Sequence, residues 1–187
     1  MDNTPEKEWA YAMRVAIVTQ SFLRTARLIE HLSQHLSNIG SEVYILTGLN
    51  RWKDFKSAPR TSVVELPVLK IPYTIAFACS ITLPLYLKRI NPDVVIDNHP
   101  QANFSSLLHN YPSIAIIYDV HFNRNFLARK VQKFISVNVI RKAKKVIVPS
   151  LVTKTQLEQL FEGEKEVCNK ICVVPLGVDL EKFRPVG

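Results

Sequence analysis

The chain has 187 residues, which is enough for one domain with a hydrophobic core and too few for two domains of ordinary size. Hydrophobic residues make up 47% and charged residues 21%, as is typical of a globular protein, and three cysteines without a framework spacing argue against a disulfide scaffold. The net charge of +8 favours contact with anionic partners. Free thiols, and an N-terminus that lacks the basic and apolar regions of a signal peptide, favour the cytoplasm.

The first part of the chain predicts a strand, a helix and two further strands. Residues 1–12 are polar, and we expect a disordered leader there. A short, continuous apolar run over 13–20 predicts a buried parallel strand. The next stretch, LRTARLIEHLSQHLSNIG, has helical spacing and ends at Gly40, in the usual C′ position. Strands are predicted again over 41–48 and 61–69.

An apolar segment over 66–90 raises the question of a membrane span. It runs from Lys70 to Lys88 without a charge, which is close to the shortest length that can cross a bilayer. It also contains Pro72, Pro84 and several hydroxyl residues. We therefore expect a buried helix at about 73–89, packed against the sheet, in preference to a span.

The strand–helix alternation continues to the end of the chain. The expected order is strand NPDVVIDNH, a short helix over about 101–110, strand PSIAIIYDVH, basic helix NFLARKVQKFISVNVIRKA, strand KKVIVPS, helix VTKTQLEQLF and strand KICVVP. Ser150 is the predicted N-cap of the last helix. This alternation predicts a Rossmann-like α/β domain over 13–175, with an open, mostly parallel sheet and helices on both faces.

Candidate site residues follow from this fold, because ligands of open parallel sheets bind beyond the carboxyl ends of the strands. The residues at these positions are Gln20, Ser21, His99, Tyr118, Asp119, His121, Ser150 and Gly177. No G-x-G-x-x-G or P-loop is present, so we expect no dinucleotide cofactor. His31 and His35, and Cys168 and Cys172, have no nearby third ligand, so we expect no metal site.

Five segments, in order, resemble the N-terminal domain of a GT-B glycosyltransferase of the family-4 type. They are MRVAIVTQSF, PDVVIDNHPQ, PSIAIIYDVHF, KKVIVPSLVTKTQL and KICVVPLGVDLEKFRP. The last segment is the most specific, because in the family such a stretch leads into the linker between two Rossmann-like domains. We expect the linker to begin at 176–187, with Gly177 in a positive-φ conformation and Asp179 capping a short helix.

The resemblance implies half of an enzyme. It implies retaining transfer of a sugar from a nucleotide-sugar to a glycan or lipid-linked acceptor, without a metal or other cofactor. The N-terminal domain of the family binds the acceptor, and the donor-binding C-terminal domain is absent from this sequence. We therefore expect the chain alone to be inactive. In this scheme Tyr118 and Asp119 take the catalytic positions, while Gln20, Ser21, His99, His121 and Ser150 bind substrate.

Three departures from the family pattern leave an alternative open. Family members usually carry a glycine pair after the first strand, where this chain has Ser21 to Arg24. Tyr118 replaces the histidine that usually precedes Asp119, and Leu176 replaces an asparagine of the closing segment. Tyr118 is either a ligand for a sugar hydroxyl or a packed strand residue. The alternative function is a stand-alone, non-catalytic binding or regulatory domain.

A basic block over 120–157 contains nine lysines and arginines and no acid. It is either a solvated helix face or an anion-binding surface. In an enzyme with a lipid-linked acceptor, apolar residues interleaved with Arg129, Lys130 and Lys133 indicate docking on anionic lipid at the inner face of the membrane. We expect no nucleic-acid partner, because the sequence contains no recognised nucleic-acid-binding module.

Overall fold

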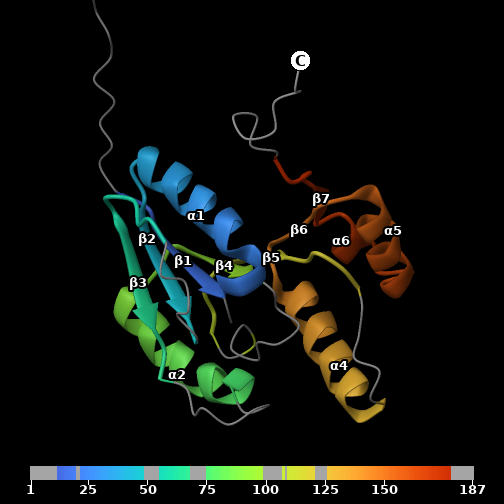
Figure 1. Cartoon of the computed structure of the whole chain (residues 1–187). Helices are drawn as coiled ribbons and strands as arrows, with labels where there is room; N and C mark the ends of the chain where they lie inside the picture. The colour runs from blue at the N-terminus through green and yellow to red at the C-terminus, as the bar shows by residue number, and fades with distance from the viewer. Residues whose placement is uncertain are drawn as a thin grey trace, which may run out of the picture.

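The structure is a computed structural model that describes residues 12–19, 22–48, 55–67, 75–98, 107, 109–120 and 126–177. In this part of the chain the strands are β1 (Arg14–Thr19), β2 (Glu42–Thr47), β3 (Thr61–Glu65), β4 (Val94–Asn98), β5 (Ser113–Ile116), β6 (Lys145–Val148) and β7 (Ile171–Val173). They form one sheet in the order β3-β2-β1-β4-β5-β6-β7, and every neighbouring pair is parallel. The expected Rossmann-like sheet is confirmed (Figure 1).

Among the described residues, helices lie between β1 and β2, between β3 and β4, between β5 and β6, and between β6 and β7, as crossovers between parallel strands. They are α1 (Phe22–Asn38), α2 (Ile75–Ile90), α4 (Phe126–Lys142), α5 (Leu151–Leu160) and the short α6 (Lys165–Cys168). The sequence pattern did not predict α6, which is a single turn between α5 and β7. The short helix expected over about 101–110 lies almost entirely outside the described residues.

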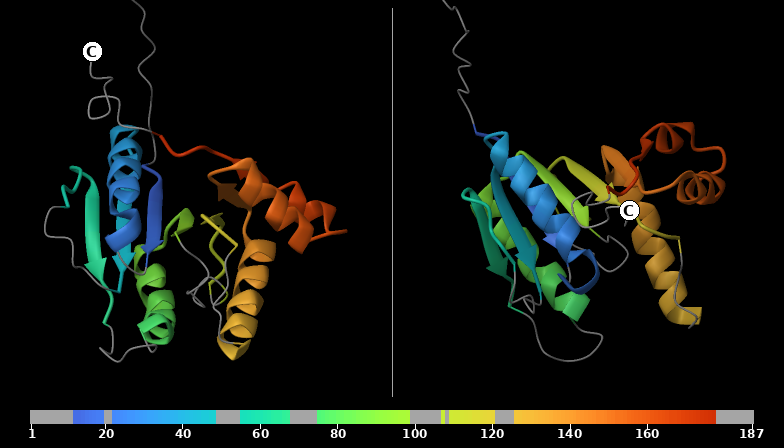
Figure 2. Two further views of the ribbon diagram at one scale, coloured as in Figure 1. Left: turned by 45° about the vertical axis from the view of Figure 1, so that its right-hand side comes forward. Right: turned by 45° about the horizontal axis from the view of Figure 1, so that its top comes forward.

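The two faces of the sheet are covered by different helices. On α1, Ile29 packs against Val15 and Ile17 of β1. On α2, Leu83 and Leu87 pack against Ala16 and Val18, which alternate to the opposite face. The expectation of helices on both faces is therefore confirmed, as Figure 2 shows from two directions.

Helix α4 lies on the same face as α2. The register aligns Val18 with Asp97 and Asp97 with Ala115 across three neighbouring strands. Ala115 packs in a cluster that includes Ile135 and Val139 of α4 and the buried residues of α5 and α6. The core on this face therefore consists of two clusters, one under α2 and one under α4, α5 and α6.

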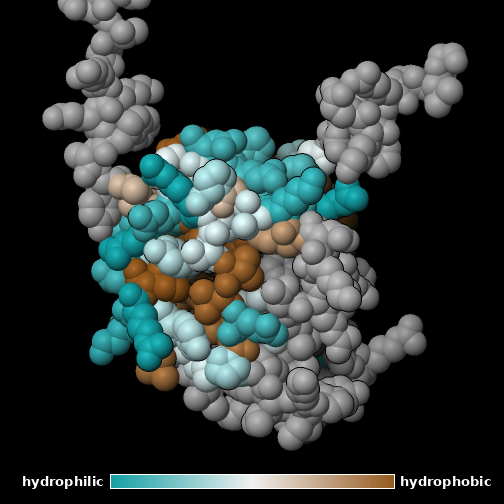
Figure 3. Space-filling view, turned by 60° about the vertical axis from the view of Figure 1, so that its left-hand side comes forward, coloured by the Kyte–Doolittle hydropathy of each residue, from teal (hydrophilic) through white to brown (hydrophobic). Residues whose placement is uncertain are grey.

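The apolar segment that raised the question of a membrane span forms α2. Among its described side chains, Leu83 and Leu87 are buried against the sheet, and Pro84 lies inside the helix. No helix among the described residues is long and apolar enough to cross a membrane. Figure 3 views the molecule from the side on which β3 lies in Figure 1, where apolar surface lies among hydrophilic side chains.

Two glycines expected to have positive φ behave differently. Gly40 has φ +92°, and the amide of Ser41 donates to the carbonyl of Leu36 while that of Gly40 donates to Ser37. This is a Schellman motif, and it confirms the predicted C′ position of Gly40 at the end of α1. Gly177 does not have a positive φ, so that prediction is wrong. Gly177 lies beyond the end of β7 at Val173, and its φ is outside the left-handed region that favours glycine.

Candidate functional site

The carboxyl ends of β1 and β4 meet where the strand order reverses. From β1 the chain builds β2 and β3 on one side, then crosses over to place β4 on the other side of β1. In open α/β sheets the crevice at such a switch point is the usual ligand site. Thr19 and Asn98 are the last residues of these strands and are in register.

A chain of side-chain hydrogen bonds joins three strands at this edge. The amide nitrogen Nδ2 of Asn98 donates to Oγ1 of Thr19 at 3.3 Å. The hydroxyl of Tyr118, just after β5, donates to Oδ1 of Asn98 at 2.6 Å. Thr19 and Asn98 are both 3% exposed, whereas Tyr118 is only partly buried. The network therefore connects the buried ends of β1 and β4 with a partly exposed side chain at the carboxyl edge of the sheet.

Burial raises the pKa of Tyr118 to about 12. The phenol is therefore protonated at neutral pH and cannot act as a general base there. Its proton is donated to Asn98, so the phenol oxygen retains acceptor capacity for a ligand hydroxyl or amide. Tyr118 is thus suited to holding a ligand in place and not to moving a proton.

Asp119 follows Tyr118 and is exposed. The next residue, Val120, packs against the cluster that contains α4, so the chain is anchored on both sides of Asp119. The structure brings Tyr118 and Asp119 together at the carboxyl edge, as the strand-end prediction requires. Their catalytic roles stay predictions.

Ser150 is the N-cap of α5, as predicted. Its hydroxyl Oγ accepts a hydrogen bond from the backbone amide of Thr153 at 3.2 Å. The Thr153 hydroxyl donates to the carbonyl of Tyr118 at 3.4 Å. The start of α5 is therefore fixed against the same segment that carries Tyr118. Contact between Ser150 and a substrate stays a prediction.

Sequence reasoning missed Thr19, Asn98 and Thr153. It selected residues just beyond each strand, whereas the polar network uses the last residue within β1 and β4. The available signal was a polar residue ending an otherwise apolar run, in AIVT and VVIDN. Gln20, Ser21, His99 and His121 lie outside the described residues, so their proposed contacts stay predictions.

The described part of the chain contains no cluster of three or more His, Cys, Asp or Glu residues that could hold a metal ion. His31 and His35 are exposed on α1. Cys168 and Cys172 are free thiols, and their sulfurs donate to the backbone carbonyls of Phe161 and Lys170 respectively. The expectation of a metal-free site stays a prediction.

The parallel sheet, its switch point and the polar edge define a Rossmann-like domain of the kind that forms one half of a GT-B fold. The sequence matches the family Glycosyltransferase Family 4 over residues 25–182, and the chain belongs to this family. The expected resemblance to an N-terminal GT-B domain is therefore confirmed. No curated protein matches the sequence at a significant level.

Solved structures share the fold at low identity. Sucrose-phosphate synthase from Thermosynechococcus elongatus matches with a TM-score of 0.69 and 13% identity, over 93% of this chain and 50% of that chain. A glycosyltransferase from Rickettsia africae matches at 0.61 and 15%, over 92% and 45%. A UDP-GlcNAc 2-epimerase from Methanocaldococcus jannaschii matches at 0.62 and 14%, over 87% and 46%. The chain thus spans about half the length of these proteins.

Proposed function

We propose that this chain is the acceptor-binding half of a retaining glycosyltransferase, which moves a sugar from a nucleotide-sugar to a glycan or lipid-linked acceptor. The observation that carries the proposal is the Thr19–Asn98–Tyr118 network at the switch point of a family-4 domain. A sugar presents many hydroxyls, each both donor and acceptor. A partly buried phenol held in one orientation by Asn98 is a suitable acceptor for one of them.

The division of labour follows from the charge that develops during the reaction. Cleavage of a nucleotide-sugar places negative charge on the leaving diphosphate, which needs preorganised cations and hydrogen-bond donors. We assign that task to a C-terminal donor-binding domain, because the chain covers 45–50% of the GT-B structures it matches. The N-terminal half then supplies Tyr118 and Asp119 beside the transferred sugar, and no metal or other cofactor is required.

The donor class to test first is a UDP-sugar. One structural neighbour, the Methanocaldococcus epimerase, was solved in complex with UDP-GlcNAc and UDP. We place the reaction in the cytoplasm, at the inner face of the membrane where the acceptor is lipid-linked.

The proposal is tested by screening the purified chain for binding to a glycan array and to UDP-sugars. We expect saccharide binding that Tyr118→Phe weakens by about three- to tenfold, the value of one hydrogen bond. Tyr111→Phe is the matched control, because Tyr111 lies before β5, at the opposite edge of the sheet. Equal binding by wild type and Tyr118→Phe would remove this edge from acceptor recognition.

A separate assay tests whether the chain is active alone. Incubation with labelled UDP-sugars and any glycan found on the array should give no transfer, because we assign diphosphate binding to a C-terminal domain outside these 187 residues. Detected transfer would refute the predicted inactivity while leaving the acceptor site intact.

The alternative is a non-catalytic binding or regulatory domain. It is favoured by the loss of the glycine pair after the first strand and by the donation of the Tyr118 proton to Asn98. The two functions predict different reading frames after the codon for Gly187. A reading frame that continues past Gly187 into a second α/β domain supports the enzyme, and a stop codon supports the binding domain.

A further inference from the structure

We propose that two copies of this chain associate through β3. The outer edge of β3 (Thr61–Glu65) in one copy pairs with the same edge of a second copy, antiparallel and about a two-fold axis at Val63. This inference goes beyond sugar transfer, since it concerns association of the chain and not its substrate. It rests on the position, the hydrogen-bonding pattern and the sequence of this strand.

Strand β3 ends the sheet on one side. It is the first strand in the order β3-β2-β1-β4-β5-β6-β7, so one of its two long sides has no neighbouring strand among the described residues. Every residue of β3 is half-buried or exposed, whereas β1 is buried after its first residue. Figure 3, viewed from the side on which β3 lies in Figure 1, shows apolar surface there. An exposed strand edge of this kind is a template for a further strand.

The hydrogen bonds to β2 determine which backbone groups of β3 point outward. The amide of Val43 donates to the carbonyl of Arg60, just before β3, and the amide of Leu66, just after β3, donates to the carbonyl of Thr47. Because the backbone groups of a strand alternate between its two sides, the even-numbered positions of β3 face β2. The outward groups are the carbonyl of Thr61 and the amides and carbonyls of Val63 and Glu65.

These outward groups are complementary to themselves across a two-fold axis. In an antiparallel pair centred on Val63, the amide of Val63 donates to the carbonyl of Val63 in the second copy and its carbonyl accepts the reverse bond. The amide of Glu65 donates to the carbonyl of Thr61 in the second copy. The amide of Thr61 is not required, because it already donates to the carbonyl of Ala58 at 3.0 Å. The contact closes on itself, so it gives a dimer and not a fibre.

The side chains of β3 are complementary in the same register. The two-fold axis places Val63 beside Val63 of the second copy, and Thr61 beside Glu65 of the second copy on the same face of the sheet. The hydroxyl oxygen Oγ1 of Thr61 is buried and has no hydrogen-bond partner among the described residues. A carboxylate opposite Thr61 is an acceptor for that hydroxyl, so pairing offers it the partner that it lacks within the described chain.

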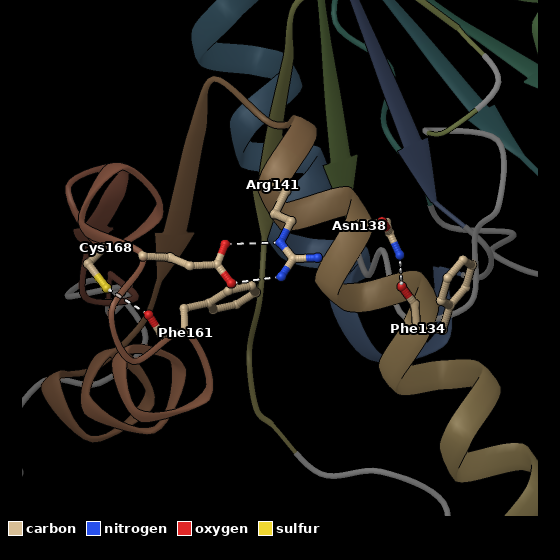
Figure 4. Close-up of polar contacts among 6 residues, drawn as sticks. Phe134, Asn138, Arg141, Phe161 and Cys168 are labelled. Carbon is tan, nitrogen blue, oxygen red and sulfur yellow. Dashed lines mark hydrogen bonds and ion pairs between the residues drawn. The ribbon is translucent and has the colours of Figure 1, made fainter.

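The other edge of the sheet is protected against such pairing. Strand β7 (Ile171–Val173) is three residues long, follows Lys170 and precedes Pro175. Shortly before β7 in the sequence, Glu164 is held by a bidentate pair with Arg141 of α4, with atoms 2.7 and 3.0 Å apart (Figure 4). Short length, lysine and proline are the features by which natural sheets prevent pairing at their edges.

Strand β3 has none of these features. Its sequence, TSVVE, contains neither lysine nor proline, and its register with β2 runs through five residues without a bulge. Pro59 and Pro67 lie just outside the strand and limit the pairing to this length, so the register is centred on Val63. The self-complementary register selects a second copy of the chain as the partner.

The test is sedimentation equilibrium of the 187-residue chain in reducing buffer, which measures its mass in solution and the dissociation constant of a dimer. We expect a mass of two chains that falls to one chain on dilution. Val63→Pro should give the mass of one chain at every concentration, because the lost amide points away from β2 and serves only the second copy. For the same reason this variant should keep the circular dichroism spectrum of the wild type.

Two substitutions of opposite charge at Thr61 test the register. Thr61→Glu places two carboxylates side by side at both ends of the paired strands and should raise the dissociation constant by about tenfold. Thr61→Lys places an ammonium group beside the carboxylate of Glu65 in the second copy and should lower the constant by about threefold. Because the chain carries a net charge of +8, a non-specific charge effect would act in the opposite direction. Thr155→Glu, at an exposed position of α5, is the control and should leave the constant unchanged.

Three results would overturn the proposal. They are a mass of one chain for the wild type at all concentrations, a dimer that Val63→Pro leaves intact, and Thr61 variants that change the dissociation constant in the same direction or not at all. The second result would assign association to another surface. The mass of the wild type and the pair of Thr61 variants test the proposal even if Val63→Pro fails to fold.

Discussion

The hydroxyl of Tyr118 donates to the side-chain oxygen of Asn98 at 2.6 Å, across the gap between β5 and β4. Asn98 in turn donates to Thr19 of β1, so one buried amide connects three strands at their carboxyl ends. The same amide fixes the phenol that we assign to acceptor binding. Under the proposed function, stability and ligand recognition are therefore coupled through Asn98.

We predict that Asn98→Ala lowers the free energy of unfolding by about 2–4 kcal/mol, because it removes two hydrogen bonds and leaves a small cavity. Tyr118→Phe should cost about 1 kcal/mol, the net value of one hydrogen bond. Urea denaturation measures both. The double variant should cost less than the sum, since the two changes share one bond. Additivity within about 0.5 kcal/mol would contradict the coupling.

We predict that Ser150→Ala lowers stability by about 1 kcal/mol, because the amide of Thr153 loses its capping acceptor. Ser150→Asp should restore most of the loss, since a carboxylate also caps and favours the positive end of the helix dipole. Thr155→Ala, at an exposed position inside α5, is the control and should not destabilise the protein. The melting temperatures of the three variants are compared with that of the wild type. An equal loss of stability in Ser150→Ala and Ser150→Asp would exclude capping by the side chain at position 150.

Periodicity predicted the elements of this fold because each depends on neighbouring residues. The apolar run of β1, the cap at Ser150 and the Schellman motif at Gly40 are all local features. The apolar segment that became α2 was also interpreted correctly, since Pro84 and its hydroxyl residues suit a helix packed on a sheet.

The site was less predictable, because it depends on which strands become neighbours. Thr19, Asn98 and Tyr118 are separated by 79 and 20 residues, and only the strand order brings them together. The single-turn helix α6 was missed because four residues are too few to show a period. At Gly177 the family pattern suggested a tight turn, but the backbone there is ordinary.

A third prediction compares how much a buried apolar residue and an exposed ion pair of α4 contribute to stability. Ile140→Ala should lower stability by about 2–5 kcal/mol, because Ile140 is buried in the cluster that joins α4 to the sheet. Its neighbour Arg141 pairs with Glu164 at the exposed surface. Arg141→Ala should therefore have a much smaller effect, which added salt removes. Chemical denaturation at low and high salt compares them. A salt-independent loss at Arg141 equal to that at Ile140 would contradict this assignment.

The last prediction concerns pH and the buried ring of His109, which is 5% exposed. Neither ring nitrogen has a hydrogen-bond partner, and Lys142 donates to the carbonyl of the same residue. Burial, with a smaller contribution from the charge of Lys142, lowers the pKa of His109 from 6.5 to about 4. Between these two values the unfolded chain binds a proton that the folded protein does not. Stability should therefore be complete above pH 6.5 and decrease as the pH falls towards 4.

Comparing the slope of that decrease between variants shows whether His109 causes the pH dependence. One unmatched proton lowers the free energy of unfolding by at most about 1.4 kcal/mol for each pH unit. His109→Phe, which preserves a ring beside Tyr111, should flatten the profile between pH 6.5 and 4, because no imidazole remains to titrate at that position. His35→Gln, at an exposed histidine of α1, should keep the wild-type slope. If His109→Phe also keeps it, a different group causes the pH dependence, and the buried imidazole is protonated at the same pH in both states.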